Sequence, residues 1–450
     1  MDGDTIVGVA TAMGEGGVAI VRLSGPDAIA IFERAFVAAK RQPPYESHRL
    51  MYGHVRDGEA VIDEAMGVVM RAPNSYTRED VCELHTHGGW ACATLTARLL
   101  ERLGARVAEP GEFTRRAFLN GRIDLTQAEA VMGVINATSA AALKAELAQL
   151  SGGSSRYLRQ AQDKLLSLLA GLEAHLDYPD EIDESEATDG LREGLDELIV
   201  TLRAAVDERG ARILREGLRV ALFGRPNAGK STLFNALLGE ERAIVTSVPG
   251  TTRDVLHGSF ALKGVNVQLM DTAGLRQSGD EAERVGVERA RQAVEQADAA
   301  LLLIDATRPL DDEDVALLGQ DLPCPCAVLL NTEDAQPVVT TANASALTTH
   351  APVLSVSAKD STGLDAVRAY LGRFIGAPNE NLLTHERHIA AAKRALERLE
   401  QARATLQNGL PIDLADVDMH DALYQLGRVT GDSVDDKLLD EIFSGFCVGK

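Results

Sequence analysis

The sequence predicts a multidomain chain of the α/β plus α class, in which an α/β domain with a mostly parallel sheet is inserted into a helical domain. Short apolar runs separated by glycine turns fill residues 1–118, whereas residues 119–214 and 379–450 carry apolar residues at helical spacing. Between these helical parts, residues 215–378 alternate continuous Val/Leu/Ile runs with amphipathic stretches, which is typical of a parallel sheet covered on both faces. The predicted domains therefore have these four ranges, and the second and fourth form one discontinuous helical domain.

Length and composition are those of several ordinary globular domains. The chain has 450 residues, of which 45% are hydrophobic and 25% charged. No apolar run is long enough to span a membrane, the N-terminus lacks signal-peptide features, and five cysteines suit a reducing compartment, so we expect a cytoplasmic protein without a membrane partner. The formal net charge of −22 opposes non-specific nucleic-acid binding. An RNA partner would have to meet a local surface or be held by another protein.

The N-terminal domain is predicted to be α+β. The expected strands lie in residues 4–11, 16–25, 60–73 and 81–89, and the expected helix in residues 91–105 ends at Gly104. His85 and His87 share one strand face and could ligate a metal. No third ligand accompanies them in the pattern, so a structural role is favoured.

The helical domain is predicted from residues 123–150, where apolar residues recur at helical spacing and one glycine is the sole breaker. An acidic stretch with a proline follows at Asp177–Gly190. It lacks the glycine that an EF-hand loop needs at its sixth position, so we expect a solvated loop between helices. The final helix, in residues 433–446, should use Ser433 as its N-terminal cap and bury one apolar stripe.

The segment Gly224–Ser231 fits the pattern G-x-x-x-x-G-K-[ST]. It follows a predicted strand and opens a predicted helix, which is the context that a phosphate-binding loop requires. Backbone N–H groups of such a loop wrap phosphates, Lys230 would reach the β- and γ-phosphates, and Ser231 would ligate Mg²⁺.

Three further motifs follow in order, each at the end of an apolar strand. Asp271–Gly274 reads D-T-A-G and would support the Mg²⁺ and supply an amide to the γ-phosphate. Asn331–Asp334 reads N-T-E-D, in which the aspartate can accept two hydrogen bonds from guanine, and Ser357–Lys359 reads S-A-K and can contact the guanine oxygen. Together they predict a Ras-like P-loop GTPase domain. The residues expected to bind GTP are Asn227, Ala228, Gly229, Lys230, Ser231, Thr232, Thr246, Ser247, Val248, Pro249, Gly250, Thr251, Thr252, Asp271, Thr272, Ala273, Gly274, Asn331, Asp334, Ser357, Ala358 and Lys359.

Two details narrow the chemistry of this domain. Small GTPases that orient the attacking water with glutamine carry it directly after D-T-A-G, but this chain has Leu275 there, which leaves Glu281 and Glu283 as candidates. Asn227, together with carbonyls of the loop at residues 246–252, could cage a monovalent cation. A K⁺ ion there would supply the charge of an arginine finger, an effect of about 10³–10⁵ in rate. The plainer alternative is that Asn227 only turns the loop.

These motifs give the chain a resemblance over essentially its full length to the MnmE or TrmE family of tRNA-modification GTPases. Its markers include P-G-E-F-T-R-R-A-F at the first domain junction, G-R-P-N-A-G-K-S-T, G-T-T-R-D and the terminal F-C-V-G-K. The resemblance implies a homodimer formed through an N-terminal domain that looks like the folate-binding part of aminomethyltransferases. It also implies an FAD-dependent partner, MnmG or GidA, in a heterotetramer with the chain. Together they would install a carboxymethylaminomethyl or aminomethyl group at C5 of the wobble uridine of tRNA, with 5-formyl- or 5,10-methylene-tetrahydrofolate as the one-carbon donor.

The resemblance also implies roles for particular residues. The catalytic residues would be Glu283, which would orient water through an intermediary, and Cys447. The implied K⁺ ligands are Asn227, Thr246, Val248 and Thr251; the Mg²⁺ ligands are Ser231 and Thr252; and the folate-binding residues are Arg22, Glu83, Arg122 and Lys450.

Three points remain open from the residues alone. Thr332 replaces the lysine that usually follows the asparagine of the guanine motif, so nucleotide affinity should be weaker while Asp334 still selects guanine. Cys447 could be a small residue that closes the last helix, but the resemblance implies that the terminal C-x-G-K reaches the folate pocket, where a thiolate could act as nucleophile or acid/base. Cys324 and Cys326 are expected to lie in a loop entering a strand.

Two other function classes compete with this interpretation. One is a ribosome-assembly GTPase switch without modification chemistry, which shares the GTPase motifs. The other is a folate-dependent aminomethyltransferase in which GTP is only regulatory. The folate-like N-terminal region and the F-C-V-G-K terminus argue against the switch.

Overall fold

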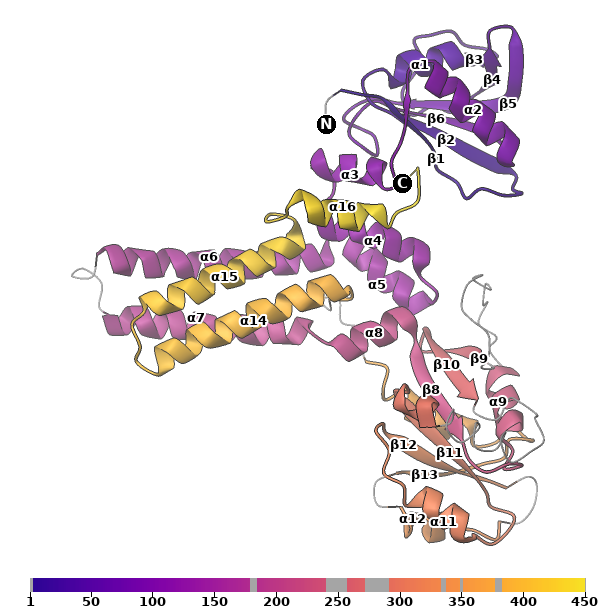
Figure 1. Ribbon diagram of the computed structural model, residues 1–450, viewed down its shortest axis with the longest axis vertical. Coiled ribbons are helices and arrows are strands. Elements are labelled where there is room, and N and C mark those ends of the chain that lie inside the picture. Colours follow the sequence, from indigo (N-terminus) through magenta and orange to yellow (C-terminus); the bar gives the residue numbers. More distant parts are fainter. Residues whose placement is uncertain are drawn as a thin grey trace. The chain divides into compact units, whose positions relative to one another are not determined.

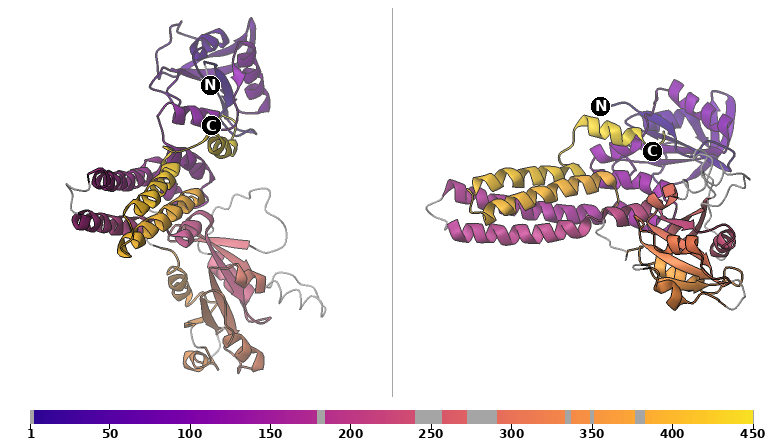
Figure 2. Two further views of the ribbon diagram at one scale, coloured as in Figure 1. Left: turned by 60° about the vertical axis from the view of Figure 1, so that its left-hand side comes forward. Right: turned by 60° about the horizontal axis from the view of Figure 1, so that its bottom comes forward.

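The computed structural model describes residues 3–178, 184–239, 257–271, 291–332, 337–348, 351–376 and 383–449. The chain divides into two compact units (Figures 1 and 2). The first unit comprises Met1–Met132, Gln149–Gly194 and Arg398–Lys450, and the second comprises Gly133–Ala148 and Leu195–Glu397. Among the described helices, none combines the length and the apolar composition that a membrane span needs.

The first unit contains a seven-stranded sheet in the order β3-β4-β5-β6-β2-β1-β7. All neighbouring strands are antiparallel except β1 and β7. The strands are β1 (Ile6–Val9), β2 (Val18–Ser24), β3 (Phe36–Ala38), β4 (Met51–Asp57), β5 (Ala60–Met70), β6 (Val81–His87) and β7 (Arg106–Val107). The helices α1 (Ala28–Ala35) and α2 (Trp90–Arg102) cover one face of this sheet (Figure 1).

Alternation along the strands separates the two faces of this sheet. In β2, Ala19, Val21 and Leu23 are buried, and the latter two join the apolar core beneath α1 and α2. Arg22 lies between them in the sequence and therefore points to the opposite face. A row of polar side chains that includes Arg22 lies on that opposite face.

The junction motif P-G-E-F-T-R-R begins helix α3 (Glu112–Leu119), and ion pairs anchor this helix to the sheet. Glu112 and Arg116 are both buried and pair at 2.9 Å, and Arg106 of β7 reaches Glu112 at 2.6 Å. Arg116 also pairs with Asp4 at 2.7 Å, just before β1. Breaking one member of such a buried network is costly, because it leaves the remaining charge uncompensated.

Helices from both ends of the chain share one core in the first unit. Helix α16 (Asp436–Ser444) lies against α3 and α4 (Leu125–Asn136), and Leu439, Phe443 and Phe446 pack on Leu125 (Figure 1). Gly111 makes the close approach possible: it has φ +70°, and a Cβ there would lie 2.6 Å from the carbonyl oxygen of Phe443.

The long helices are α6 (Gly153–Asp177), α7 (Glu184–Ala205), α14 (Glu386–Gln407) and α15 (Asp413–Thr430). Helices α6 and α15 pack together in the first unit. The part of α14 that belongs to this unit begins at Arg398, which pairs with Asp418 and Asp421 of α15 at 3.3 and 2.7 Å. The predicted loop at Asp177–Gly190 is wrong from Glu184 onward, where α7 begins. Acidic residues favour the first turn of a helix as well as loops, and this explains the error.

The predicted cap of the last helix is also wrong. The carboxylate of Asp435, not Ser433, accepts a hydrogen bond from the N–H of Leu438 at 2.8 Å, and α16 begins at Asp436. Both are common capping residues, so the sequence alone did not separate them.

The second unit contains a six-stranded sheet in the order β13-β12-β11-β8-β10-β9. Its strands are β8 (Leu218–Phe223), β9 (His257–Leu262), β10 (Val265–Asp271), β11 (Ala299–Asp305), β12 (Cys326–Asn331) and β13 (Val353–Val356). All pairs are parallel except β9 with β10, in agreement with the predicted mostly parallel sheet. Leu301 and Leu303 join the apolar cluster on one face, and Leu302 and Ile304 join the cluster on the other.

Helices complete the second unit. They are α5 (Ala140–Leu150, up to Ala148 in this unit), α8 (Glu208–Glu216), α9 (Lys230–Gly239), α11 (Asp312–Leu318), α12 (Thr341–Ser345) and α13 (Leu364–Leu371). Helix α5 contacts the turn between β9 and β10, where the N–H of Ala141 donates to the carbonyl of Gly264 at 2.9 Å.

Candidate functional site

The predicted nucleotide motifs meet at the carboxyl edge of the six-stranded sheet. Gly224 follows β8, Asp271 is the last residue of β10 and aligns with Leu222 of β8, and Asn331 is the last residue of β12. Ser357 follows β13. In open parallel sheets, ligands bind in the crevice at this edge, so the topology brings together motifs that are far apart in the sequence.

The phosphate-binding loop is shaped by three residues with positive φ. Gly224 has φ +143° and a Cβ on it would lie 2.3 Å from the carbonyl oxygen of Leu303, so the loop starts in close contact with β11. Asn227 (φ +63°) and Gly229 (φ +96°) follow. Asparagine is one of the few side chains that tolerate this conformation, which fits the turning role that the sequence left open for Asn227.

Lys230 is buried at the start of α9, and its ammonium donates to the carbonyls of Gly224 at 2.8 Å and Arg225 at 2.6 Å. The next two residues, Ser231 and Thr232, are exposed in the first turn of α9. The N-terminus of a helix directly after a glycine-containing loop is suited to binding phosphate, because its N–H groups and the helix dipole favour negative charge.

Asn331 connects two of the motifs. Its side chain is buried, its amide N–H donates to the carbonyl of Ala228 at 3.0 Å, and its amide oxygen accepts from the N–H of Ala358 at 3.2 Å. The asparagine therefore ties the phosphate loop to the S-A-K loop. Thr332 turns toward the neighbouring strand, where its hydroxyl donates to the carbonyl of Val356 at 3.3 Å.

The S-A-K loop is itself held in a defined shape. The N–H of Ser357 donates to the carbonyl of Thr362 at 3.0 Å, and the Ser357 hydroxyl accepts from the N–H of Asp360 at 3.3 Å. Ala358 is buried and Lys359 is exposed. This loop lies beside the phosphate loop through the Asn331 bridge.

Several predicted site residues lie outside the described residues. They are Thr246, Ser247, Val248, Pro249, Gly250, Thr251, Thr252, Thr272, Ala273, Gly274, Glu281, Glu283, Asp334 and Lys450. Most of the K⁺ set, one of the two Mg²⁺ ligands and the guanine-selecting carboxylate therefore stay predictions.

A second group of predicted residues meets on the seven-stranded sheet of the first unit. Gly8 of β1 pairs with Arg22 of β2, and Arg22 pairs with Glu83 of β6. The three residues form one row across three strands and point to the same face, away from α1 and α2. The Nε of Arg22 donates to Glu83 at 2.8 Å.

Glu83 is held in its ionised form. Burial raises the pKa of this carboxyl, but the hydrogen bond from His85 at 3.0 Å and the charge of Arg22 outweigh it, so the pKa lies below its ordinary value. A carboxylate fixed in this way can accept hydrogen bonds from N–H groups of a ligand.

Two aromatic rings complete the row and were missed in the sequence. The guanidinium of Arg22 lies 5.3 Å from the ring centre of Tyr76 and 5.7 Å from that of Phe113. Arg122, another of the predicted folate-binding residues, lies over the same tyrosine, 4.6 Å from the ring centre of Tyr76, and donates to the Tyr76 carbonyl at 3.1 Å. Tyr76 carries no motif and Phe113 lies in the junction motif without an assigned role, so only the fold reveals their contact with Arg22.

The C-terminal C-V-G segment packs beside this row. Val448 forms an isolated bridge with Pro110, and the N–H of Gly111 donates to the carbonyl of Cys447 at 3.4 Å. A Cβ on Gly8 would lie 3.1 Å from the Cα of Gly449, so the tail passes directly over the missing side chain in the row. The thiol of Cys447 is exposed.

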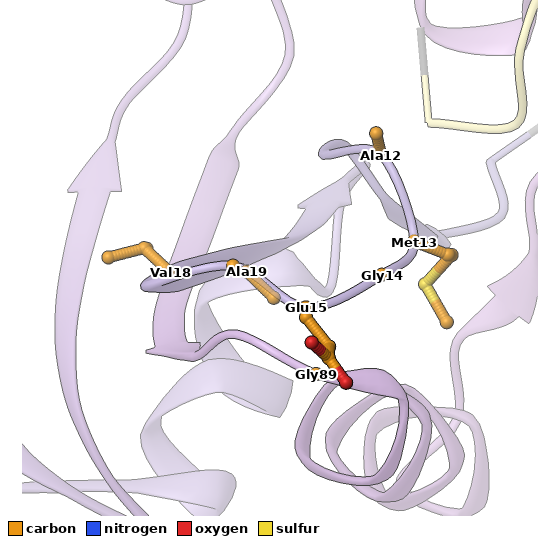
Figure 3. Close-up of a pocket in the computed structure, with 8 residues that line it drawn as sticks. Ala12, Met13, Gly14, Glu15, Val18, Ala19 and Gly89 are labelled. Carbon is orange, nitrogen blue, oxygen red and sulfur yellow. The ribbon is translucent and has the colours of Figure 1, made fainter.

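A pocket of about 230 Å³ lies at the beginning of α2 (Figure 3). It is lined by Ala12, Met13, Gly14, Glu15, Gly16, Val18, Ala19 and Gly89. Figure 3 shows the side chain of Glu15, the one charged group of the lining, reaching toward Gly89. None of the predicted folate residues belongs to this lining.

The two histidines that could have shared a metal, His85 and His87, bind different carboxylates. His85 bonds to Glu83, whereas His87 bonds to Asp63 at 2.8 Å. Cys324 lies in the loop before β12 and Cys326 begins that strand, as expected, and burial raises the pKa of the Cys326 thiol to about 12. Within the part of the chain that the structure describes, one exposed or half-exposed trio, namely Glu173, Asp416 and His420, brings metal-type ligand atoms within 4.8 Å of one another. Ion pairing of the imidazole with both carboxylates accounts for that trio.

A phosphate-binding loop at the carboxyl edge of a mostly parallel six-stranded sheet, followed by N-x-x-D and S-A-K, defines a P-loop GTPase. Two family models match the chain: "GTP-binding protein TrmE N-terminus" over residues 5–122 and "MnmE helical domain" over residues 125–447. The chain belongs to the MnmE family of tRNA modification GTPases, and it is therefore an enzyme that hydrolyses GTP.

Individual relatives agree with this assignment. The tRNA modification GTPase MnmE of Listeria welshimeri is 42% identical over 460 residues, which cover 100% of both chains. The protein of the same name from Streptococcus thermophilus is 42% identical over 456 residues, covering 99% of this chain and 98% of the relative. Among solved structures, an Era variant from Aquifex aeolicus bound to GDP and AlF₄⁻ matches 40% of this chain and 65% of its own, with 26% identity and a TM-score of 0.28.

Proposed function

We propose that this chain acts in the cytoplasm as the GTPase of a tRNA-modifying complex. With an FAD-dependent MnmG/GidA-type partner in a heterotetramer, it installs a carboxymethylaminomethyl or aminomethyl group at C5 of the wobble uridine of tRNA. The one-carbon unit comes from 5-formyl- or 5,10-methylene-tetrahydrofolate. The observation that carries the proposal is the packing of the C-terminal C-V-G segment over Gly8, beside the Arg22–Glu83 pair. A GTPase that only switched ribosome assembly would need neither this tail nor this polar row.

The residues around the row suit a folate. An ionised Glu83 can accept the N–H groups of a pterin ring, Arg22 keeps this carboxylate in place, and Tyr76 with Arg122 offers a flat aromatic and cationic surface. Arg122 and Lys450 would hold the carboxylates of the glutamate tail. The folate supplies the one-carbon unit when bound, and these residues bind and orient it.

Cys447 would bring a thiol to the one-carbon site. Its side chain is exposed, while its carbonyl and the two residues that follow are anchored to the N-terminal domain. Exposure and anchoring together suit a group that touches substrate, and the proposal assigns the thiol a role as nucleophile or acid/base.

The GTPase reaction would use the residues at the carboxyl edge of the second sheet. Lys230 binds the β- and γ-phosphates, Ser231 and Thr252 hold Mg²⁺, and Glu283 orients water through an intermediary. Asn227 and the loop residues Thr246, Val248 and Thr251 would hold K⁺, which would supply positive charge to the reaction when bound. Potassium acts when two GTPase domains of a homodimer meet, and the dimer itself forms through the N-terminal domains.

The second unit offers a physical route from the nucleotide module to its flanking helices. The β9–β10 turn bonds to α5 through Ala141 and Gly264, and the ammonium of Lys263 donates to the carbonyl of Gly372 at the end of α13, at 2.7 Å. Glu146 of α5 pairs with His385, next to the start of α14, at 3.1 Å. A shift of β9 would therefore move α5 and the start of α14 together.

Nucleoside analysis of tRNA from a deletion strain tests the proposal. We expect loss of the wobble-uridine modification and its return on expression of the full chain. Normal tRNA nucleosides accompanied by a ribosome-assembly defect would overturn the proposal and favour the alternative, a ribosome-assembly GTPase switch.

A further inference from the structure

The phosphate loop contains one arginine, Arg225, directly after Gly224, and its side chain is bound by a group of carboxylates. The guanidinium donates to the carboxylate of Asp311, and its second terminal nitrogen lies 2.8 Å from Glu313. A third carboxylate, that of Asp314, lies 3.8 Å away. Residues 311–314 follow β11 and begin α11, so the arginine links the loop after β8 to the loop after β11.

Asp311 and Asp314 are held in place by contacts that do not involve Arg225. Asp311 caps α11 by accepting from the N–H groups of Glu313 and Asp314, and the carboxylate of Asp314 accepts in return from the N–H of Asp311. Asp314 is 1% exposed and is neutralised by Arg308 at 2.8 Å. The hydrogen bond from the Asp314 backbone and the guanidinium of Arg225 hold the pKa of Asp311 below its ordinary value. The acceptors of Arg225 are thus fixed in position and charged.

The backbone of the same residue supports the phosphate-binding lysine. The carbonyl of Arg225 accepts from the ammonium of Lys230 at 2.6 Å, so a displacement of residue 225 moves an acceptor of that ammonium. Elsewhere the loop is fixed by the close approach of Gly224 to β11 and by the hydrogen bond of Asn331 to Ala228. Among the contacts of the described residues, Arg225 supplies the one side-chain anchor between those two points.

We propose that Arg225 is a positioning residue of the nucleotide site: its guanidinium pins the first half of the phosphate loop to the beginning of α11. This inference rests on the proposed GTP site. A guanidinium bound to these carboxylates would contribute little of the charge that an arginine finger supplies, so no such role is assigned to Arg225.

Release of a fluorescent GDP analogue from the full chain, followed by stopped flow, tests the inference. Arg225→Ala should release GDP about twofold to fivefold faster, the size expected when a partly exposed ion-pair network is lost. In steady-state hydrolysis, the larger part of the loss should appear in KM and the smaller part in kcat, because the residue acts on loop position and not on the reacting atoms.

Four further variants separate a positioning role of Arg225 from a general loss of stability. Asp311→Asn keeps a capping oxygen for α11 and removes the charge, so it should reproduce the effect of Arg225→Ala, and the double variant should add little to either. Arg225→Lys should restore part of the slow release. Arg368→Ala removes a pairing arginine from α13 and should behave as wild type.

The possible results distinguish a failure of the positioning role of Arg225 from a failure of the proposed nucleotide site. If wild type retains GDP and hydrolyses GTP but Arg225→Ala and Asp311→Asn release GDP at the wild-type rate, the positioning role is wrong and the GTP site stands. If Arg225→Ala lowers kcat and the melting temperature without changing GDP release, the role is structural and the inference is also wrong. If wild type itself fails to bind the GDP analogue, the proposed nucleotide site fails.

Discussion

Replacing Gly449 by alanine tests the link between the C-terminal segment and the proposed one-carbon site. Gly449 has φ +97°, and a Cβ on it would lie 2.2 Å from the carbonyl oxygen of Val9 and 3.0 Å from the Cα of Ala10. Both contacts are with backbone, so no side chain can rotate away to make room. The substitution should therefore displace the tail from β1 without changing the thiol of Cys447.

The free-energy cost of docking the tail with alanine at position 449 follows from the backbone conformation there. A non-glycine residue in a positive-φ region of this kind costs about 1–3 kcal/mol, and the collision with Val9 adds to that cost. Since about 1.4 kcal/mol corresponds to a tenfold change in an equilibrium constant, the equilibrium constant for docking of the tail should fall by roughly fivefold to 150-fold. The GTPase site should be unaffected, because Gly449, Val9 and Ala10 belong to the first unit and the described residues of the GTPase site belong to the second.

The assay is in vitro tRNA modification with the partner protein, run beside GTP turnover. We expect Gly449→Ala to lose most modification while keeping GTP turnover, and hydrogen exchange of the C-terminal peptide to accelerate. Gly445→Ala is the matched control in the same segment: its φ is −76°, and a Cβ there would be 3.6 Å from the nearest atom, the carbonyl oxygen of Ile442. Equal modification by the two variants would refute the docking argument.

Other predictions follow from the same two sites. Cys447→Ser should keep GTP turnover and abolish tRNA modification in vitro, because the docked tail remains but the thiol is lost; full modification by this variant would reduce the cysteine to a packing role. Asn331→Ala leaves two buried backbone groups without their partner, at a cost of about 1–3 kcal/mol each, so GDP should dissociate at least tenfold faster; an unchanged rate would contradict the bridging role. The pKa of Glu83 is lowered on folding, so its pairing stabilises the folded state above the ordinary carboxyl range near 4.5 and is lost as the pH falls through the lowered value. Arg22→Ala should therefore be less stable than wild type in urea unfolding at pH 7, and the difference should shrink below pH 4.5; a difference independent of pH would contradict this pairing.

The meeting of the described nucleotide motifs at one sheet edge was predictable because each motif is local. A phosphate loop is a contiguous run between a strand and a helix, and the following motifs each end a strand of the same parallel sheet. The role of Asn331 was not predictable in this way. Its amide bonds to residues 228 and 358, and those contacts arise from the alignment of β12 with its neighbours.

The proposed one-carbon site was assigned by resemblance alone. Nothing in the spacing of Arg22 and Glu83 indicates contact, and it is the antiparallel register of β2 and β6 that makes them direct neighbours. The requirement for glycine at both position 8 and position 449 likewise follows from a contact between the two ends of the chain. The prediction of Ser433 as the cap of the last helix was also wrong, because Ser433 and Asp435 are both acceptable capping residues and stand two positions apart.

The central claim is that a potassium ion bound by Asn227 and its loop drives two GTPase domains together. The most direct measurement is GTP turnover of the full chain in K⁺ and in Na⁺ buffers of equal ionic strength, over a range of protein concentrations, for wild type and Asn227→Ala. We expect wild type to turn over faster in K⁺, with a rate per chain that rises with protein concentration, and the variant to lose this K⁺ stimulation while still binding GDP. Equal turnover in the two salts, independent of concentration, would contradict the account.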